Sequence, residues 1–242
     1  KKTSLTIGNS VTTIGNGAFY NCMGLRSIEI PNSVITIGDG AFKECSGLRS
    51  IEIPNSVKTI GKEAFKYCRG LRYVTIGSGV TKIGEDTFFC CDNLAYIDVN
   101  IDNLKYSSDE GVLFNKDKSE LIHYPVKSER HEYIVPNSVI TIGSNAFRGI
   151  YNFYSIEIPD SVKSIKAGAF DICRSLKDVY YSGSEEQWKK ISIDSGNDYL
   201  LNAEIHYNSS LPDQPETPDN PDSPKLKPQS FKVVDKTYKD KY

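Results

Sequence analysis

The sequence has few of the residues that most often carry catalysis. Its 242 residues include three histidines, one tryptophan and one methionine. It contains no Gly-rich phosphate loop, no Gly-x-Ser-x-Gly elbow and no His-Glu-x-x-His zinc motif. His123 and His131 lie close together, but no acidic or cysteine neighbour completes a metal-ligand pattern. We therefore expect no enzymatic activity, no cofactor and no metal site, with a Cys–His pair of His123 and Cys90 or Cys91 as the alternative.

The sequence also lacks strong charge and long apolar runs. The formal net charge is −2, so no basic field favours nucleic acid. No apolar run approaches the roughly 20 residues that a membrane helix needs. No signal peptide or anchor is recognisable, and the chain opens inside a strand at residues 4–7. We interpret it as a mature or trimmed fragment that inserts into no membrane and binds no nucleic acid.

What the sequence does contain is a repeat. Residues 28–50 read IEIPNSVITIGDGAFKECSGLRS, and residues 51–73 read IEIPNSVKTIGKEAFKYCRGLRY. Aligned copies begin at Leu5, Ile28, Ile51, Val74, Tyr133 and Ile156, with phenylalanine at the fifteenth position as Phe19, Phe42, Phe65, Phe88, Phe147 and Phe170. One such unit cannot bury its apolar face alone, whereas stacked units can. The repeat therefore predicts a solenoid that advances by roughly 4.8 Å per coil.

Each unit has a recognisable internal pattern. Residues 27–30 alternate polar and apolar, which predicts a short strand with isoleucines inward. Residues 31–33, Pro-Asn-Ser, predict a turn. The apolar spacing within residues 41–48 predicts about one helical turn packed inward. A glycine precedes this segment in most copies, as Gly38 does, and could adopt a positive φ.

This pattern resembles the BspA-like leucine-rich repeats, whose consensus is close to LxxIxIPxxVxxIGxxAFxxCxxL, over residues 5–207. The resemblance implies an α/β fold, namely a curved leucine-rich repeat solenoid with a short-strand parallel sheet. It also implies a surface or secreted protein of anaerobic bacteria or some protists, several members of which adhere to host matrix proteins. The asparagine ladder of better-known leucine-rich repeats is replaced by serines, so their binding rules are not transferred: Ser10, Ser33, Ser56 and Ser138.

We expect one elongated repeat domain at residues 1–208. It comprises regular coils at 5–96, an irregular coil at 97–132, coils at 133–178 and a C-terminal cap at 179–208. Residues 209–224 read as a Pro-rich acidic linker, and residues 225–242 as a Lys-rich tail or the start of a following module.

The irregular coil and the cap have their own signals. Two apolar runs, residues 111–114 and 121–125, flank a polar turn and predict a β-hairpin. This coil either keeps the stack continuous or forms a protruding recognition loop. In the cap, residues 184–187 read Ser-Glu-Glu-Gln, a capping box that opens a short helix. Trp188 would then cover the end of the core.

Cysteine recurs with the repeat. One position is occupied by Cys22, Cys45, Cys68, Cys91 and Cys173. Ile150 takes this position in the fifth copy, which indicates small buried hydrophobic residues with free thiols. Disulfides are the alternative for a secreted protein. Cys90 lies outside the pattern and is expected nearer the surface.

The outward strand positions change along the chain. They are Ser27 and Glu29, Ser50 and Glu52, Tyr73 and Thr75, then Tyr96 and Asp98, flanked by Arg26, Arg49 and Arg72. The face is either solvated and crossed by Arg–Glu pairs or a ligand surface. The change to tyrosine favours binding. We predict a ligand-binding surface of Tyr73, Thr75, Tyr96, Asp98 and Arg72, beside the 97–132 coil.

The sequence thus predicts a non-enzymatic, monomeric binding or adhesion module of a bacterial surface protein. Its partner would be a host extracellular or matrix protein or a glycan, recognised outside the cell. The alternative is a structural spacer or the targeting domain of a larger secreted enzyme.

Overall fold

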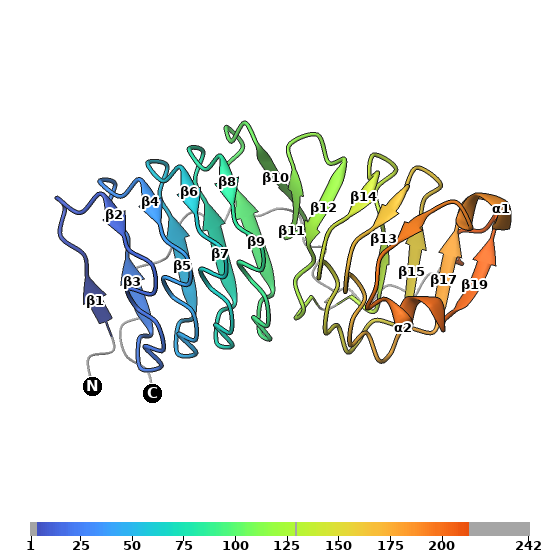
Figure 1. Cartoon of the computed structure of the whole chain (residues 1–242), viewed down its shortest axis with the longest axis horizontal. Helices are drawn as coiled ribbons and strands as arrows, with labels where there is room; N and C mark the ends of the chain where they lie inside the picture. Colours follow the sequence, from blue (N-terminus) through green and yellow to red (C-terminus); the bar gives the residue numbers. More distant parts are fainter. Residues whose placement is uncertain (1–3, 129, 213–242) are drawn as a thin grey trace, which may run out of the picture. The chain divides into compact units, whose positions relative to one another are not determined.

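A computed structural model describes residues 4–128 and 130–212 (Figure 1). The compact unit ends at Leu211. The tail predicted at 225–242 and most of the linker predicted at 209–224 lie outside the described residues. No helix in the described part is long and apolar enough to cross a bilayer.

The first half of the unit is built from two rows of short parallel strands. One row holds β1 (Ser4–Thr6), β3 (Ser27–Glu29), β5 (Ser50–Ile53), β7 (Tyr73–Ile76) and β9 (Tyr96–Val99). The other holds β2 (Thr13–Ile14), β4 (Thr36–Ile37), β6 (Thr59–Ile60) and β8 (Lys82–Ile83). Equivalent repeat positions pair directly, as Ile51 pairs with Val74. The predicted solenoid is confirmed, because each repeat contributes one strand to each row.

The second half resumes both rows and ends in two short helices. Its strands are β13 (Glu132–Ile134), β15 (Ser155–Ile158), β17 (Asp178–Tyr181) and β19 (Glu204–Tyr207), with β14 (Thr141–Ile142), β16 (Ser164–Ile165) and β18 (Ser192–Ile193) in the other row. The helices are α1 (Glu185–Trp188) and α2 (Asp198–Leu201). Ser184 forms the predicted capping box with Gln187. Trp188 is buried edge-on against Tyr181, as expected of a lid.

The predicted hairpin lies between the halves. β11 (Val112–Asn115) pairs antiparallel with β12 (Glu120–His123), and β12 pairs parallel with β14, so the hairpin joins the sheet of β14, β16 and β18. The strands β2, β4, β6 and β8 form a separate sheet. A further strand, β10 (Tyr106–Asp109), pairs antiparallel with β11. Residues 97–106 still follow the repeat positions: Tyr106 stands one repeat after Ile83, and its hydroxyl accepts a hydrogen bond from the Ile83 N–H at 3.0 Å.

A column of stacked rings runs through the core. Phe19, Phe42, Phe65 and Phe88 stack with centroids 5.0, 5.2 and 5.9 Å apart. Tyr124, Phe147 and Phe170 repeat the arrangement with centroids 5.2 and 5.0 Å apart. We call these seven residues the aromatic column. Each ring covers the next, so a coil is buried only when its neighbours are present.

The helical turn predicted within residues 41–48 is not formed. The N–H of Ala41 donates to Gly38 three residues back, but the N–H of Phe42 donates to Ala64 in the next coil. Backbone N–H groups along this segment donate alternately to a carbonyl of their own coil and to one of the next coil, so the segment is a series of turns and not a helix. The described helices are therefore confined to the cap. Gly38 is required by contact and not by a positive φ, because a Cβ there would lie 2.7 Å from the backbone nitrogen of Asn16.

All six cysteines are free. The Cys45 thiol donates to the Phe19 carbonyl at 3.0 Å, and the equivalent thiols of Cys68, Cys91 and Cys173 each donate in the same way to a phenylalanine carbonyl of an adjacent coil. The expected burial holds for these four but is wrong for Cys22, which is exposed because no described coil covers it. Cys90 is half-buried.

Candidate functional site

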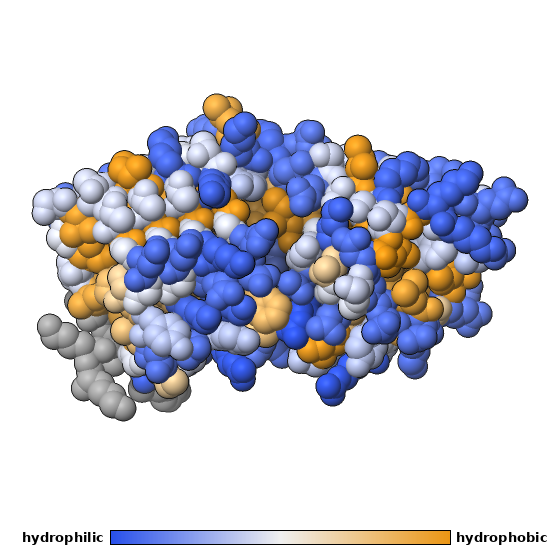
Figure 2. Space-filling view, in the orientation of Figure 1, coloured by the Kyte–Doolittle hydropathy of each residue, from blue (hydrophilic) through white to orange (hydrophobic). Residues whose placement is uncertain are grey.

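The strands β7 and β9 place the predicted surface residues side by side. Tyr73 pairs with Tyr96, and Thr75 with Asp98. The intervening apolar residues are buried, so these four side chains point outward. Arg72 adjoins them, since its carbonyl accepts from the Tyr96 N–H at 3.2 Å. We call these five residues the outward face; Figure 2 shows hydrophilic side chains over β5, β7 and β9.

The two tyrosines of this face differ in their surroundings. Tyr73 is 54% exposed, whereas Tyr96 is half-buried. The Tyr96 ring packs on Gly111 of the hairpin, where an added Cβ would lie only 2.6 Å from Cδ2 of the ring. No stacking between Tyr73 and Tyr96 occurs among the described rings. Tyr96 therefore ties the hairpin to the sheet, and Tyr73 is the ring left free for contact.

Charged side chains line the hairpin beside Tyr96. Arg130 Nη2 lies 2.7 Å from Glu110 Oε2, and Lys118 Nζ lies 2.5 Å from Asp109 Oδ2. Burial, and then the carboxylates of Asp98 and Glu110, raise the pKa of Tyr96. Its hydroxyl accordingly stays protonated at neutral pH and can donate a hydrogen bond.

The arginines that flank the strands are not paired as expected. Within residues 4–128 and 130–212, no ion pair joins Arg26, Arg49 or Arg72 to Glu29, Glu52 or Asp98. The interpretation of this face as a series of Arg–Glu pairs is thus wrong. Arg72, next in sequence to Tyr73, forms no ion pair within the described part of the chain.

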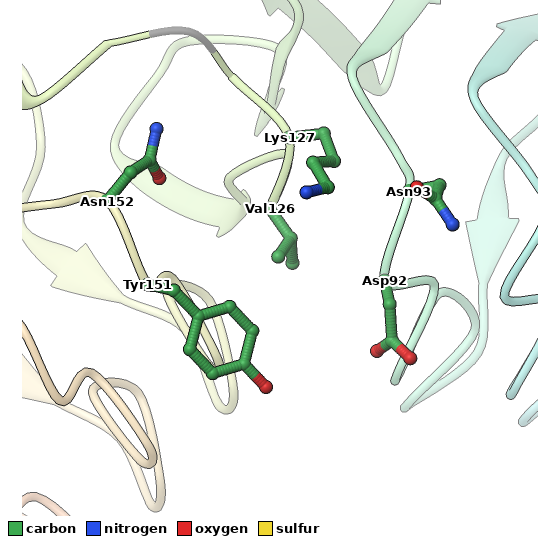
Figure 3. A pocket seen from close by; sticks show the side chains of 6 residues that line it. All are labelled: Asp92, Asn93, Val126, Lys127, Tyr151 and Asn152. Carbon is green, nitrogen blue, oxygen red and sulfur yellow. The ribbon is translucent and has the colours of Figure 1, made fainter.

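A hollow that the sequence did not suggest lies next to this face. It encloses about 410 Å³ and is lined by Asp92, Asn93, Val126, Lys127, Tyr151 and Asn152. Figure 3 shows Asp92 and Asn93 on one side and Tyr151 and Asn152 on the other. These two pairs occupy the same repeat positions, just after Cys91 and Ile150. That equivalence is the one sequence signal for the hollow, but it does not reveal the space that the irregular coil leaves between them.

Hydrogen bonds to main-chain carbonyls hold the walls of the hollow. The Lys127 N–H donates to Leu94 at 2.8 Å, and Asn152 Nδ2 donates to the Ser128 carbonyl at 3.0 Å. The lining combines a carboxylate, two amides, an ammonium group and an exposed tyrosine. This set suits hydrogen bonding to a polar ligand and stacking on it.

The alternative Cys–His pair is not formed. The His123 ring packs against Phe88, and its Nε2 is buried without a hydrogen-bond partner. Burial lowers the pKa of His123 to about 4. The Cys91 thiol donates to the Phe65 carbonyl at 3.2 Å, and Cys90 Sγ receives a hydrogen bond from Arg148 Nη1 at 3.1 Å. Neither thiol is placed for activation by His123.

Comparison with known proteins identifies the repeat. The model of the BspA type leucine rich repeat region matches six copies, over residues 1–111 and 127–202. The chain belongs to this family. No curated protein matches the chain.

Solved structures of leucine-rich repeat proteins share the fold of this BspA-type chain. One, from Eubacterium ventriosum, is 22% identical with a TM-score of 0.59, covering 74% of this chain and 60% of its own. The pneumococcal vaccine antigen PcpA is 19% identical with a TM-score of 0.55, covering 86% of this chain and 68% of its own. The chain thus spans about 60% of the length of the Eubacterium ventriosum protein.

Proposed function

We propose that this BspA-type solenoid is a non-enzymatic binding module of a bacterial surface protein, which contacts a host matrix protein or a glycan outside the cell. The observation that carries the proposal is the exposed Tyr73 ring on a rigid pair of strands, next in sequence to Arg72, which forms no ion pair among the described residues. Tyrosine and arginine are enriched where proteins bind one another, and a rigid aromatic loses little conformational entropy on binding.

The hairpin supports the same assignment. Tyr96 and Gly111 fix it against β9, so it lies as a wall beside Tyr96 and Asp98, one strand away from Tyr73 and Thr75. The hollow beyond this wall offers further polar contacts at Asp92 and Lys127. A partner that spans both would bury a continuous surface at the junction of the two halves.

The experiment has two steps. The purified chain is first screened on an array of matrix proteins and glycans, and the affinity of each hit is then measured for wild type and Tyr73→Ser. Serine is chosen because Ser27 and Ser50 occupy this position in earlier coils. We expect a loss of about 2 kcal/mol or more, the scale of an interface hot spot.

The control is Tyr199→Ser, which removes a tyrosine of α2 that is 38% exposed. It should leave the affinity unchanged. Tyr96→Ser is measured separately, because it also removes the contact that holds the hairpin. Unchanged affinity of folded Tyr73→Ser would place the contact elsewhere, and no binding on the array would favour a spacer or targeting domain.

A further inference from the structure

The strands β17 and β19, the last two of the row that begins with β1, bring three potential metal ligands together. Glu204 and His206 are two residues apart on β19, so their side chains leave the same face of the strand. Asp178 of β17 pairs directly with Glu204 across the sheet. One oxygen of each carboxylate and one imidazole nitrogen all lie within 4.8 Å of one another.

The imidazole is held in place from two sides. His206 Nε2 lies 2.9 Å from Asp178 Oδ1. The Tyr180 ring stacks on the imidazole with centroids 4.6 Å apart and planes 17° apart. Tyr180 also pairs with His206 in the register of the sheet, so the stacking follows from the backbone. The ligand nitrogen is therefore preorganised toward the carboxylates.

We propose that Asp178, Glu204 and His206 form a binding site for a divalent transition-metal ion, with Zn²⁺ as the best match. Zn²⁺ accepts one imidazole nitrogen and two carboxylate oxygens at about 2.0–2.2 Å, whereas Mg²⁺ and Ca²⁺ favour oxygen ligands alone. Ligand atoms around such an ion lie roughly 3.3–3.5 Å apart in a tetrahedron. The three atoms lie within 4.8 Å of one another, so the exposed Glu204 side chain would rotate to bring them into this range.

The local charge favours a cation. Among the described residues, no lysine or arginine forms an ion pair with Asp178 or Glu204. The only basic side chain within ion-pair distance of Asp178 in this part of the chain is His206. Burial, and then the carboxylates of Asp178, Glu204 and Glu132 in that order, raise the pKa of Tyr180. A bound ion would offset the repulsion between these carboxylates.

Binding requires one proton to move. Coordination uses the lone pair of His206 Nε2, so the proton that this nitrogen shares with Asp178 goes to Nδ1 or to solvent. Protons therefore compete with the ion, and acid weakens binding. The three residues supply three of the coordination positions of the ion, and water or a side chain of a partner can fill the remaining ones.

The test is a titration of the tag-free chain with ZnCl₂ at pH 7.5 by isothermal titration calorimetry. We expect one site, with at least a tenfold loss of affinity in His206→Ala and in Asp178→Asn. The control His131→Ala removes a histidine elsewhere on the surface, and Cys22→Ser removes the exposed thiol that could bind zinc by itself. Both controls should bind as the wild type does.

A second readout separates the metal site from a structural role of His206. Zn²⁺ should raise the Tm of the wild type, because the ion links β19 to β17, and EDTA should reverse the rise. It should not raise the Tm of His206→Ala, and a circular dichroism spectrum of this variant checks that the fold is kept. No heat of binding, binding retained in His206→Ala, or binding lost in Cys22→Ser would each overturn the proposal.

Discussion

Phe88 and His123 face each other across the junction of the two halves, with ring centroids 5.9 Å apart and planes tilted by 54°. Phe88 is the last ring of the first stack, and His123 precedes Tyr124, the first ring of the second. The apolar residues on the two sides form separate buried clusters. This histidine thus covers the last ring of the first stack where the irregular coil begins the second half.

Replacing His123 should remove part of the loss of stability in acid. Burial lowers the pKa of His123 to about 4 in the fold, against 6.5 for an ordinary histidine. Between these values the unfolded chain binds a proton that the folded chain does not bind. The free energy of unfolding should therefore fall by up to about 3 kcal/mol as the pH is lowered from 6.5 toward 4. Urea melts at pH 7, 6 and 5 should show a shallower fall for His123→Phe.

The control for this measurement is His131→Gln. His131 is exposed, so this change removes one histidine without altering the core. It should leave the wild-type pH dependence in place. An equally steep loss of stability in His123→Phe would show that other groups cause it.

Truncating the aromatic column should be costly where a ring is covered on both sides. Phe65 is fully buried between Phe42 and Phe88. Phe65→Ala should lower the free energy of unfolding by about 3–5 kcal/mol. Phe19 is only half-buried and stacks on Phe42 alone among the described rings, so Phe19→Ala should cost less. Equal losses, or a loss below about 1 kcal/mol for Phe65→Ala, would contradict the column's role.

The cysteines should separate into two classes of reactivity. Burial raises the pKa of Cys45 and of Cys173 to about 12, so at pH 8 they hold almost no thiolate. Iodoacetamide should alkylate the exposed Cys22 of the native protein. Cys45, Cys68, Cys91 and Cys173 should react only after denaturant is added. Mass spectrometry of non-reduced digests reads the result, and disulfide-linked peptides would refute it.

Asn103 should resist replacement by the residue that the repeat prefers. It stands one repeat after Val80 and is completely buried. Its Nδ2 donates to the Gly77 and Val80 carbonyls at 2.9 and 3.1 Å, and its Oδ1 accepts from the N–H groups of Lys105 and Tyr106, both at 2.8 Å. Asn103→Val leaves these groups without partners, so we expect a loss of about 2 kcal/mol or more.

The matched change is Val80→Ala in the preceding coil, which removes apolar contacts and no hydrogen bond. Denaturant melts of both variants should show that Asn103→Val is destabilised although valine is apolar and similar in size to asparagine. An unchanged midpoint for Asn103→Val would mean that the loop at residues 100–105 finds other partners.

The repeat made the fold predictable, because identical spacing of apolar residues forces each coil to stack on the next in register. Ile28, Ile51 and Val74 could be placed inward from their alternation alone. Hairpin and cap were predictable for the same local reason, since turn residues and a capping box act within a few positions. The prediction of a helical turn at residues 41–48 was wrong, because N–H groups of this segment donate hydrogen bonds to the neighbouring coil. No local sequence pattern indicates such bonds.

Tertiary structure alone decided which surface residues meet. The sequence placed Tyr73 and Tyr96 at one repeat position, but only the hairpin makes their surroundings differ, because Gly111 packs against the Tyr96 ring. Asp178 and His206 are 28 residues apart and show no ligand spacing, yet adjacent strands bring them within 2.9 Å. The sequence by itself determined the stacking, because that depends on a local period. The contacts of the site depend on distances between coils, and only the assembled solenoid sets those.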